Sequence, residues 1–136
     1  MNHPVHHIGI VVEDMLAARA QYEKTWGATI TPTEQLTQYG LELCFVECGN
    51  TRVELLAPLD PDAPIGVFLR EHGPGLHHIC YQVTDLVAEL RRVKELGLAL
   101  IDEKPRPGAK GTMIAFLKPQ AGTGTLVELL QVTAEG

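Results

Sequence analysis

Apolar and polar residues follow the same order twice along this chain. The first half opens with an apolar, β-branched stretch at 5–12, which predicts a strand. Asp14 then stands where a helix N-cap is expected, and Gly27 where a helix commonly ends. The predicted helix between them carries apolar residues at helical spacing: Met15, Ala18, Tyr22 and Trp26.

Three further strands complete the first half. They are predicted at 29–33, 41–46 and 51–57, and Gly49-Asn50 joins the last two as a hairpin turn. A short helix is predicted at 65–72, because proline is tolerated in a first helical turn and Pro64 precedes it.

The second half repeats this order. Strands are predicted at 76–83, 98–102, 112–117 and 124–132, and Asp85 stands where it would cap a helix. One face of that helix is apolar, and it consists of Leu86, Leu90, Val93 and Leu96. Each half therefore reads βαβββ, which predicts an α+β fold.

The length of 136 residues suits one domain. We predict a first repeat at about 5–58, a linker with the short helix at 59–75, and a second repeat at about 76–132. A repeat of roughly 60 residues would be marginal by itself, so we expect the two to share one core.

Composition narrows the functional classes. The formal net charge of −6 argues against nucleic-acid binding, which requires a basic surface. No apolar run is long enough to span a membrane, and the N-terminus does not resemble a signal peptide. Three cysteines without a pairing pattern indicate reduced thiols, so we expect a cytoplasmic protein.

The repeat also duplicates residues that bind metals. His6-His7-Ile8 recurs 71 positions later as His77-His78-Ile79, and Val53-Glu54-Leu55-Leu56 recurs 74 positions later as Val127-Glu128-Leu129-Leu130. If the halves are related by a pseudo-twofold axis, two histidines and two glutamates meet at one place. Such a set suits a divalent cation with open positions, and Co²⁺, Ni²⁺, Mn²⁺, Fe²⁺ and Zn²⁺ all fit it.

Strand alternation selects among these residues. Adjacent histidines point to opposite faces, so only one of each pair can reach a shared centre. Gly9 leaves room on the face of His7, which favours His7 and, by the repeat, His78. Glu54 and Glu128 each point away from the flanking apolar residues, and a carboxylate on an inner face is costly to bury unless it is paired or bound to metal.

Four strings carry a family resemblance. They are His-His-Ile-Gly-Ile at 6–10, Gly-Asn-Thr-Arg-Val-Glu-Leu-Leu-Ala-Pro-Leu at 49–59, Gly-Leu-His-His-Ile-Cys at 75–80 and Leu-Val-Glu-Leu at 126–129. With the twin βαβββ pattern, they resemble the methylmalonyl-CoA epimerase branch of the vicinal oxygen chelate superfamily. The resemblance implies two repeats that form a curved mixed sheet, a half-barrel, around a metal site with the helices outside.

The resemblance also implies a reaction and its residues. The metal, Co²⁺ in the first place with Zn²⁺, Ni²⁺ or Mn²⁺ as alternatives, would be bound by His7, Glu54, His78 and Glu128. The reaction would interconvert (2R)- and (2S)-methylmalonyl-CoA by 1,1-proton transfer through a metal-stabilised enolate. Two glutamates would serve as acid and base. Glu128 matches one of them, and Glu42 is the candidate for the other, with Glu47 as a weaker alternative.

A basic stretch offers a contact for the acyl-CoA substrate. Four cations stand close together in an otherwise acidic chain, and they are candidates to bind CoA phosphates: Lys104, Arg106, Lys110 and Lys118. The stretch 118–124 departs from the family pattern, which leaves the acyl group open. Relatives of this fold often dimerise, so we expect a homodimer.

Other functions compete with the epimerase. A glyoxalase I-like lyase would act on a glutathione hemithioacetal, and a metal-free module of the same fold would sequester drugs. An extradiol dioxygenase would need two histidines and one carboxylate, so the fourth ligand Glu54 argues against it. The presence of all four ligand-type residues argues against the metal-free module.

Overall fold

Residues 2–6 fold with the second half of the chain rather than with the first. The computed structural model describes residues 2–133. It forms two compact units: residues 7–77, here the N-terminal unit, and residues 2–6 with 78–133, here the C-terminal unit. In the C-terminal unit, the amide of Gln82 donates to the carbonyl of Pro4 at 2.9 Å, which fixes the N-terminal segment to the start of the second repeat.

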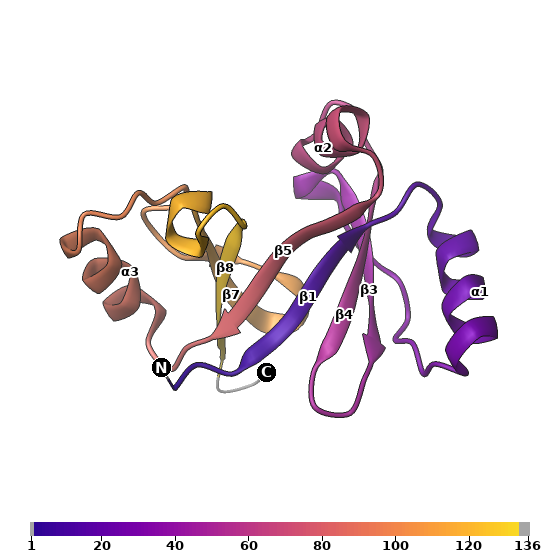
Figure 1. Cartoon of the computed structure of the whole chain (residues 1–136), viewed down its shortest axis with the longest axis horizontal. Helices are drawn as coiled ribbons and strands as arrows, with labels where there is room; N and C mark the ends of the chain where they lie inside the picture. The colour runs from indigo at the N-terminus through magenta and orange to yellow at the C-terminus, as the bar shows by residue number, and fades with distance from the viewer. Residues whose placement is uncertain (1, 134–136) are drawn as a thin grey trace. The chain divides into compact units, whose positions relative to one another are not determined.

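The N-terminal unit contains a mixed sheet with the strand order β2-β3-β4-β1. β1 pairs in parallel with β4, whereas β4 with β3 and β3 with β2 are antiparallel. α1 packs on β3 and β4, and α2 contacts β4 (Figure 1). The elements are β1 (Val5–Val11), α1 (Met15–Trp26), β2 (Glu34–Leu36), the 3-10 helix η1 (Thr37–Tyr39), β3 (Leu41–Glu47), β4 (Arg52–Pro58) and α2 (Pro64–His72).

The predicted ends of α1 are confirmed, but one of the apolar residues at helical spacing is not buried. The carboxylate of Asp14 accepts the amide of Ala17 at 3.1 Å, and Gly27 closes the helix with φ +60°. Met15 is buried against the sheet. Trp26 instead remains 74% exposed, because it lies one turn beyond Tyr22, the last apolar residue of the helix that packs on the sheet.

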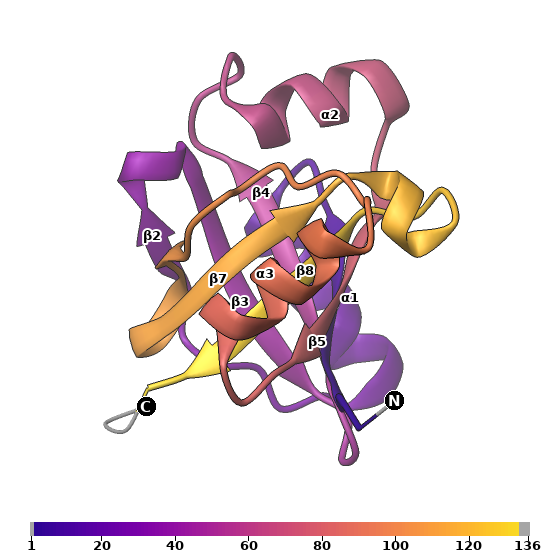
Figure 2. The same cartoon turned by 90° about the vertical axis from the view of Figure 1, so that its left-hand side faces the viewer.

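The C-terminal unit repeats this arrangement with the strand order β5-β8-β7-β6. β5 pairs in parallel with β8, whereas β8 with β7 and β7 with β6 are antiparallel. α3 covers β7 and β8 (Figure 2). The elements are β5 (Gly75–Gln82), α3 (Leu86–Glu95), β6 (Arg106–Pro107), η2 (Ala109–Gly111), β7 (Thr112–Leu117), η3 (Pro119–Gly122) and β8 (Val127–Val132).

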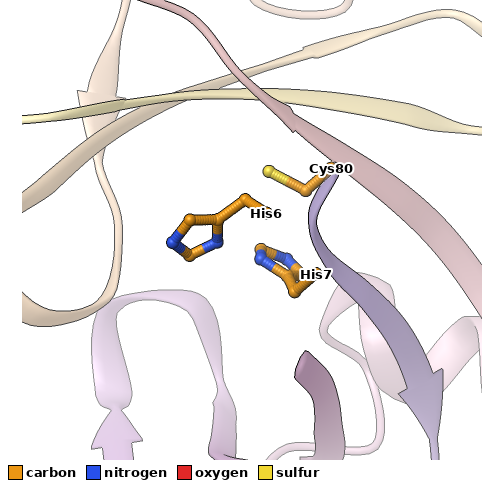
Figure 3. Close-up of side chains that lie close together, drawn as sticks. All are labelled: His6, His7 and Cys80. Atoms are coloured by element: carbon orange, nitrogen blue, oxygen red, sulfur yellow. The ribbon is translucent and has the colours of Figure 1, made fainter. Parts of the chain in front are cut away.

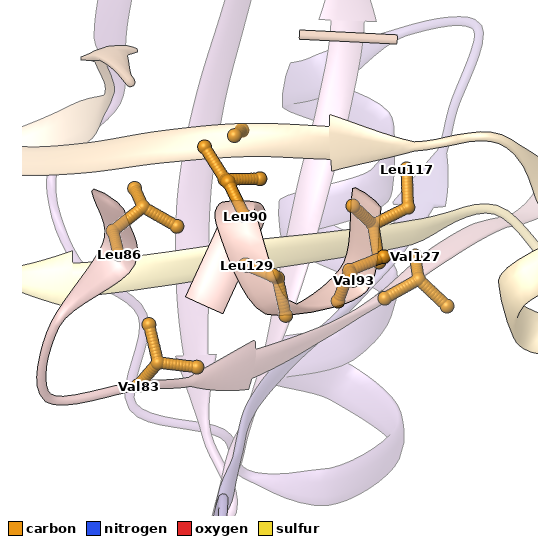
Figure 4. Close-up of a cluster of buried hydrophobic side chains, with 8 residues drawn as sticks. Val83, Leu86, Leu90, Val93, Leu117, Val127 and Leu129 are labelled. Carbon is orange, nitrogen blue, oxygen red and sulfur yellow. The ribbon is translucent and has the colours of Figure 1, made fainter. Parts of the chain in front are cut away.

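The core of the C-terminal unit lies between α3 and one face of this sheet (Figure 4). Asp85 caps α3 as predicted, since its carboxylate accepts the amide of Ala88 at 3.1 Å. The helix buries its apolar stripe, except that Leu96 at its end is 64% exposed. The buried cluster consists of Val83, Leu86, Leu90, Val93, Ala115, Leu117, Val127 and Leu129. The opposite face of the sheet is therefore not covered by α3.

Two predicted strands are wrong at equivalent places in the repeat. The segment 29–33 is reduced to one bridge between Ile30 and Val46, and 98–102 to one between Leu100 and Leu117. After the first bridge stands Pro32, which has no amide to continue the ladder. After the second, the amides of Ile101 and Asp102 both donate to the carbonyl of Phe116, which interrupts regular pairing. The short strands β2 and β6 form further along the chain instead, so each repeat keeps its βαβββ order. The predicted α+β class is confirmed.

In the part of the chain that the structure describes, no helix combines the length and the apolar character needed to cross a membrane.

Candidate metal centre

The N-terminal unit brings His7 and Glu54 together. Gly9 on β1 lies opposite Glu54 on β4, so His7, two residues before Gly9, points to the same face as Glu54. His7 Nε2 is 3.4 Å from Glu54 Oε1, and the two side chains are 2% and 8% exposed. Phe45 lies opposite Glu54 on β3, and its ring meets the His7 imidazole edge-on at 5.6 Å.

The C-terminal unit repeats this pair with His78 and Glu128. Cys80 on β5 lies opposite Glu128 on β8, so His78 and Glu128 share a face. His78 Nε2 is 3.0 Å from Glu128 Oε1, and the side chains are 2% and 7% exposed. Phe116 lies opposite Glu128 on β7, and its ring stands edge-on to the His78 imidazole at 5.5 Å.

Each pair is here called a half-site, and each lies on the sheet face that its helix does not cover. His7 and His78 are each 2% exposed, which agrees with the preference for them over His6 and His77 as ligands. Phe45 and Phe116 were not singled out from the sequence. They recur at the same spacing of 71 residues as the histidines, so the repeat itself contained the signal that could have identified them.

The donor set of each half-site fits a divalent cation. A buried carboxylate is costly without a compensating charge, and a neutral imidazole supplies none. Imidazole nitrogen and carboxylate oxygen are common ligands of Co²⁺, Ni²⁺, Mn²⁺ and Zn²⁺. Each half-site contains one ligand of each kind, and all four residues are buried and offer one ligand atom. Both half-sites therefore suit the same class of ion.

The neighbouring histidines have other partners. His6 is half-buried, and in the C-terminal unit a nitrogen of its ring lies within 4.8 Å of the Cys80 sulfur (Figure 3). His77 packs edge-on against Phe68 of α2, with 4.8 Å between the ring centroids. His72 lies against the same ring, also at 4.8 Å. His77 thus packs against an aromatic ring of α2.

Glu42 lies on the other face of its sheet from Glu54. Phe45 is directly opposite Glu54, and Glu42, an odd number of residues from Phe45, therefore points the other way. Its partner on β4 is Ala57, which belongs to the buried cluster under α1. Glu47 shares the face of Phe45, but it lies at the hairpin end of β3, 3.9 Å from Arg52. The role of Glu42 as an acid or base stays a prediction.

Burial under α1 also affects a thiol. The Cys44 sulfur lies 3.6 Å from the Met15 sulfur, and burial raises the pKa of the Cys44 thiol, although Arg19 partly offsets this effect. Cys44 therefore remains a protonated core residue at neutral pH. The three cysteines Cys44, Cys48 and Cys80 are free thiols, as the sequence predicted.

The four candidate CoA-binding cations do not form one cluster. Lys104, Lys110 and Lys118 are exposed. Lys110 precedes β7 and Lys118 follows it, so these two lie at opposite ends of a six-residue strand. Arg106 differs from the lysines, because its side chain is only 33% exposed and its Nε donates to the Asp102 carboxylate at 3.2 Å.

Comparison with known proteins places this geometry in a family. Residues 6–116 match the model of the glyoxalase/bleomycin resistance protein/dioxygenase superfamily, so the chain belongs to this superfamily. The predicted recognition at the superfamily level is thereby confirmed.

Several of the similar proteins are epimerases of acyl-CoA thioesters. The chain is 40% identical over 130 residues to the ethylmalonyl-CoA/methylmalonyl-CoA epimerase of Cereibacter sphaeroides, covering 94% of this chain and 97% of that protein. It is 37% identical to the mitochondrial methylmalonyl-CoA epimerase of Homo sapiens, covering 93% of this chain and 73% of that one. A solved methylmalonyl-CoA epimerase in complex with methylmalonyl-CoA and NH4+ superposes with a TM-score of 0.91 at 29% identity, covering 97% of this chain and 96% of that one.

Proposed function

We propose that this protein is a metal-dependent epimerase that interconverts (2R)- and (2S)-methylmalonyl-CoA by 1,1-proton transfer. The observation that carries the proposal is the repeated buried His–Glu pair, found in a chain that has methylmalonyl-CoA epimerases among its relatives. A binding module without catalysis would not need to bury two carboxylates beside two imidazoles. Burial of these carboxylates and imidazoles is instead expected where they bind a cation, because the cation offsets the cost of removing the carboxylates from water.

We further propose that His7, Glu54, His78 and Glu128 bind one divalent metal ion, so that the two units form a single domain around it. When bound, the ion would supply Lewis acidity toward the thioester carbonyl oxygen of the substrate. The family resemblance favours Co²⁺, with Zn²⁺, Ni²⁺ and Mn²⁺ as alternatives. Elemental analysis of the purified protein identifies the metal, and a ratio near one ion per chain is expected.

Glu128 is our candidate for one proton-transferring group. The α-proton of the substrate lies between a thioester and a carboxylate, and its removal requires a base placed on one face of that carbon. Glu128 is 5% exposed, and its strand partners Cys80 and Phe116 are buried and half-buried, so water is largely excluded around it. Epimerisation also requires an acid on the opposite face, and Glu42 remains the proposal for that role.

The CoA moiety would be bound outside the half-sites. Lys104, Lys110 and Lys118 are exposed cations in an acidic chain, and we propose that they attract the CoA phosphates. Arg106 belongs to the same proposal, although its bond to Asp102 ties it to the sheet. We also expect a homodimer in the cytoplasm. Sedimentation analysis tests the oligomeric state.

The deciding experiment follows the C2 proton of the substrate. The protein is incubated with methylmalonyl-CoA in D₂O, and loss of the C2 proton signal is measured by NMR. Exchange that depends on the bound metal is expected, and ethylmalonyl-CoA tests the tolerance for a larger acyl group. If the C2 proton persists while a glutathione hemithioacetal is consumed, the lyase replaces the epimerase. If neither reacts and the protein holds no metal, the binding module replaces both.

A further inference from the structure

Asp102, which the sequence analysis did not single out, fixes the position of Arg106. Its Oδ2 accepts the amide of Phe116 at 2.8 Å, and its own amide donates to the carbonyl of Phe116 at 3.0 Å. The same Oδ2 accepts Nε of Arg106 at 3.2 Å. A carboxylate bonded to the backbone in this way cannot move freely, so the guanidinium bonded to it is also held in place.

The sheet register places Arg106 on the face of the His78–Glu128 half-site. Arg106 on β6 lies opposite Ile114 on β7, and Ile114 shares its face with Phe116. Phe116 in turn lies opposite Glu128. The guanidinium carbon lies 5.5 Å from the centre of the Phe116 ring, whose edge meets His78. A fixed cation therefore lies one aromatic ring away from a candidate metal ligand.

We propose that Arg106 binds the free carboxylate of the acyl group, and that Asp102 is a positioning residue for it. This inference rests on the proposed function and specifies its substrate class, a CoA thioester with a second carboxylate beside the α-carbon. A guanidinium has five N–H donors in a plane that suits a carboxylate. A cation at the carboxylate also favours removal of the α-proton, because it offsets the repulsion between two negative charges in the enolate.

This role differs from a contact with CoA phosphates in a measurable way. A phosphate contact is shared by every CoA thioester, whereas a carboxylate contact is made only by ligands that carry the carboxylate. Methylmalonyl-CoA and propionyl-CoA differ by that carboxylate alone. Their dissociation constants, measured by calorimetry on the protein with its metal as purified, therefore separate the two roles.

Arg106→Gln is expected to raise the dissociation constant of methylmalonyl-CoA about ten- to a hundredfold, while that of propionyl-CoA changes less than about twofold. Asp102→Asn should give a smaller loss with the same selectivity, because an amide oxygen in the place of Oδ2 can still accept both hydrogen bonds but lacks the negative charge. Arg91→Gln, at an exposed arginine of α3, is the matched control and should change neither constant. Arg106→Lys keeps the positive charge but not the planar set of N–H donors, and it replaces Arg106→Gln in this experiment if that variant does not fold.

An equal loss for both ligands would assign Arg106 to the CoA phosphates and overturn the inference, as would no loss for either. A selective loss of the same size in Arg91→Gln would also overturn it. Proton exchange by the unaltered protein is read separately. If that exchange is absent, the proposed function fails, whereas the ligand selectivity of Arg106→Gln still decides whether this arginine recognises the carboxylate.

Discussion

The ring of Phe116 stands edge-on to the imidazole of His78, with 5.5 Å between centroids and 83° between planes. The first repeat contains the same contact between Phe45 and His7, at 5.6 Å and 67°. In both units the phenylalanine lies directly opposite the glutamate of the half-site. One aromatic ring therefore limits the orientation of the imidazole and also covers the carboxylate.

This contact predicts that Phe116→Leu weakens metal binding. Leucine keeps much of the apolar volume but leaves the imidazole freer to rotate, and loss of such an orienting neighbour costs about tenfold in metal affinity. Phe45→Leu should act in the same direction on the other half-site. Competition with a chromogenic chelator measures both affinities. Unchanged affinity in both variants would show that the rings only fill space.

Glu128→Gln should lower the rate of C2 proton exchange by about two to four orders of magnitude, because an amide cannot accept the proton. The variant keeps the size of the side chain, and its melting temperature checks that the fold survives. Exchange at the original rate would remove Glu128 from the mechanism.

Glu42→Gln tests the second acid or base by the same measurement. If Glu42 transfers a proton, the rate falls to a similar extent as in Glu128→Gln. Glu42 lies on the α1 face of the sheet and Glu54 on the other face. The result therefore shows whether a residue on the α1 face takes part in proton transfer. Glu23→Gln, at an exposed glutamate of α1, is the matched control, and Glu47→Gln tests the alternative candidate. A rate that Glu42→Gln leaves intact would exclude Glu42.

Glu54→Gln should be tolerated better than Glu128→Gln. An amide oxygen can still coordinate a cation, although without the negative charge, so metal affinity should fall while proton exchange persists when metal is in excess.

Removal of the metal with a chelator should lower the melting temperature of the unaltered protein, because its two buried carboxylates lose their counter-charge. The destabilisation should be smaller in Glu54→Gln. An equal destabilisation would contradict a ligand role for Glu54.

The sequence was sufficient for those features that local pattern decides. Asp14 and Asp85 cap helices at equivalent places, because a short acidic side chain before an apolar stripe favours that start. The choice of His7 over His6 followed from strand alternation and the side chain that Gly9 lacks. His7 is indeed 2% exposed.

Tertiary pairing decided the features that the sequence did not predict. The segments 29–33 and 98–102 have strand-like composition, but each makes only a single bridge. Trp26 has the helical spacing of a core residue, yet it lies one turn beyond Tyr22, which packs against the buried cluster, and it is 74% exposed. The hydrogen bond that the Phe116 amide donates to the Asp102 carboxylate joins residues 14 positions apart. Threonine, Thr31, stands at the position of the first repeat that matches Asp102, so the repeat did not mark this carboxylate.

The three thiols should differ in reactivity. Alkylation requires the thiolate, and burial raises the pKa of Cys44, so this thiol stays protonated at neutral and mildly alkaline pH. Cys80 is also buried, whereas Cys48 is exposed at the hairpin end of β3. We expect iodoacetamide at pH 8 to label Cys48 in the native protein and all three thiols after unfolding, as mass spectrometry of peptides would show. Cys48→Ser should abolish native labelling. Labelling of Cys44 at the rate of Cys48 would mean that α1 opens readily from its sheet, because only an opened helix exposes that sulfur to the reagent.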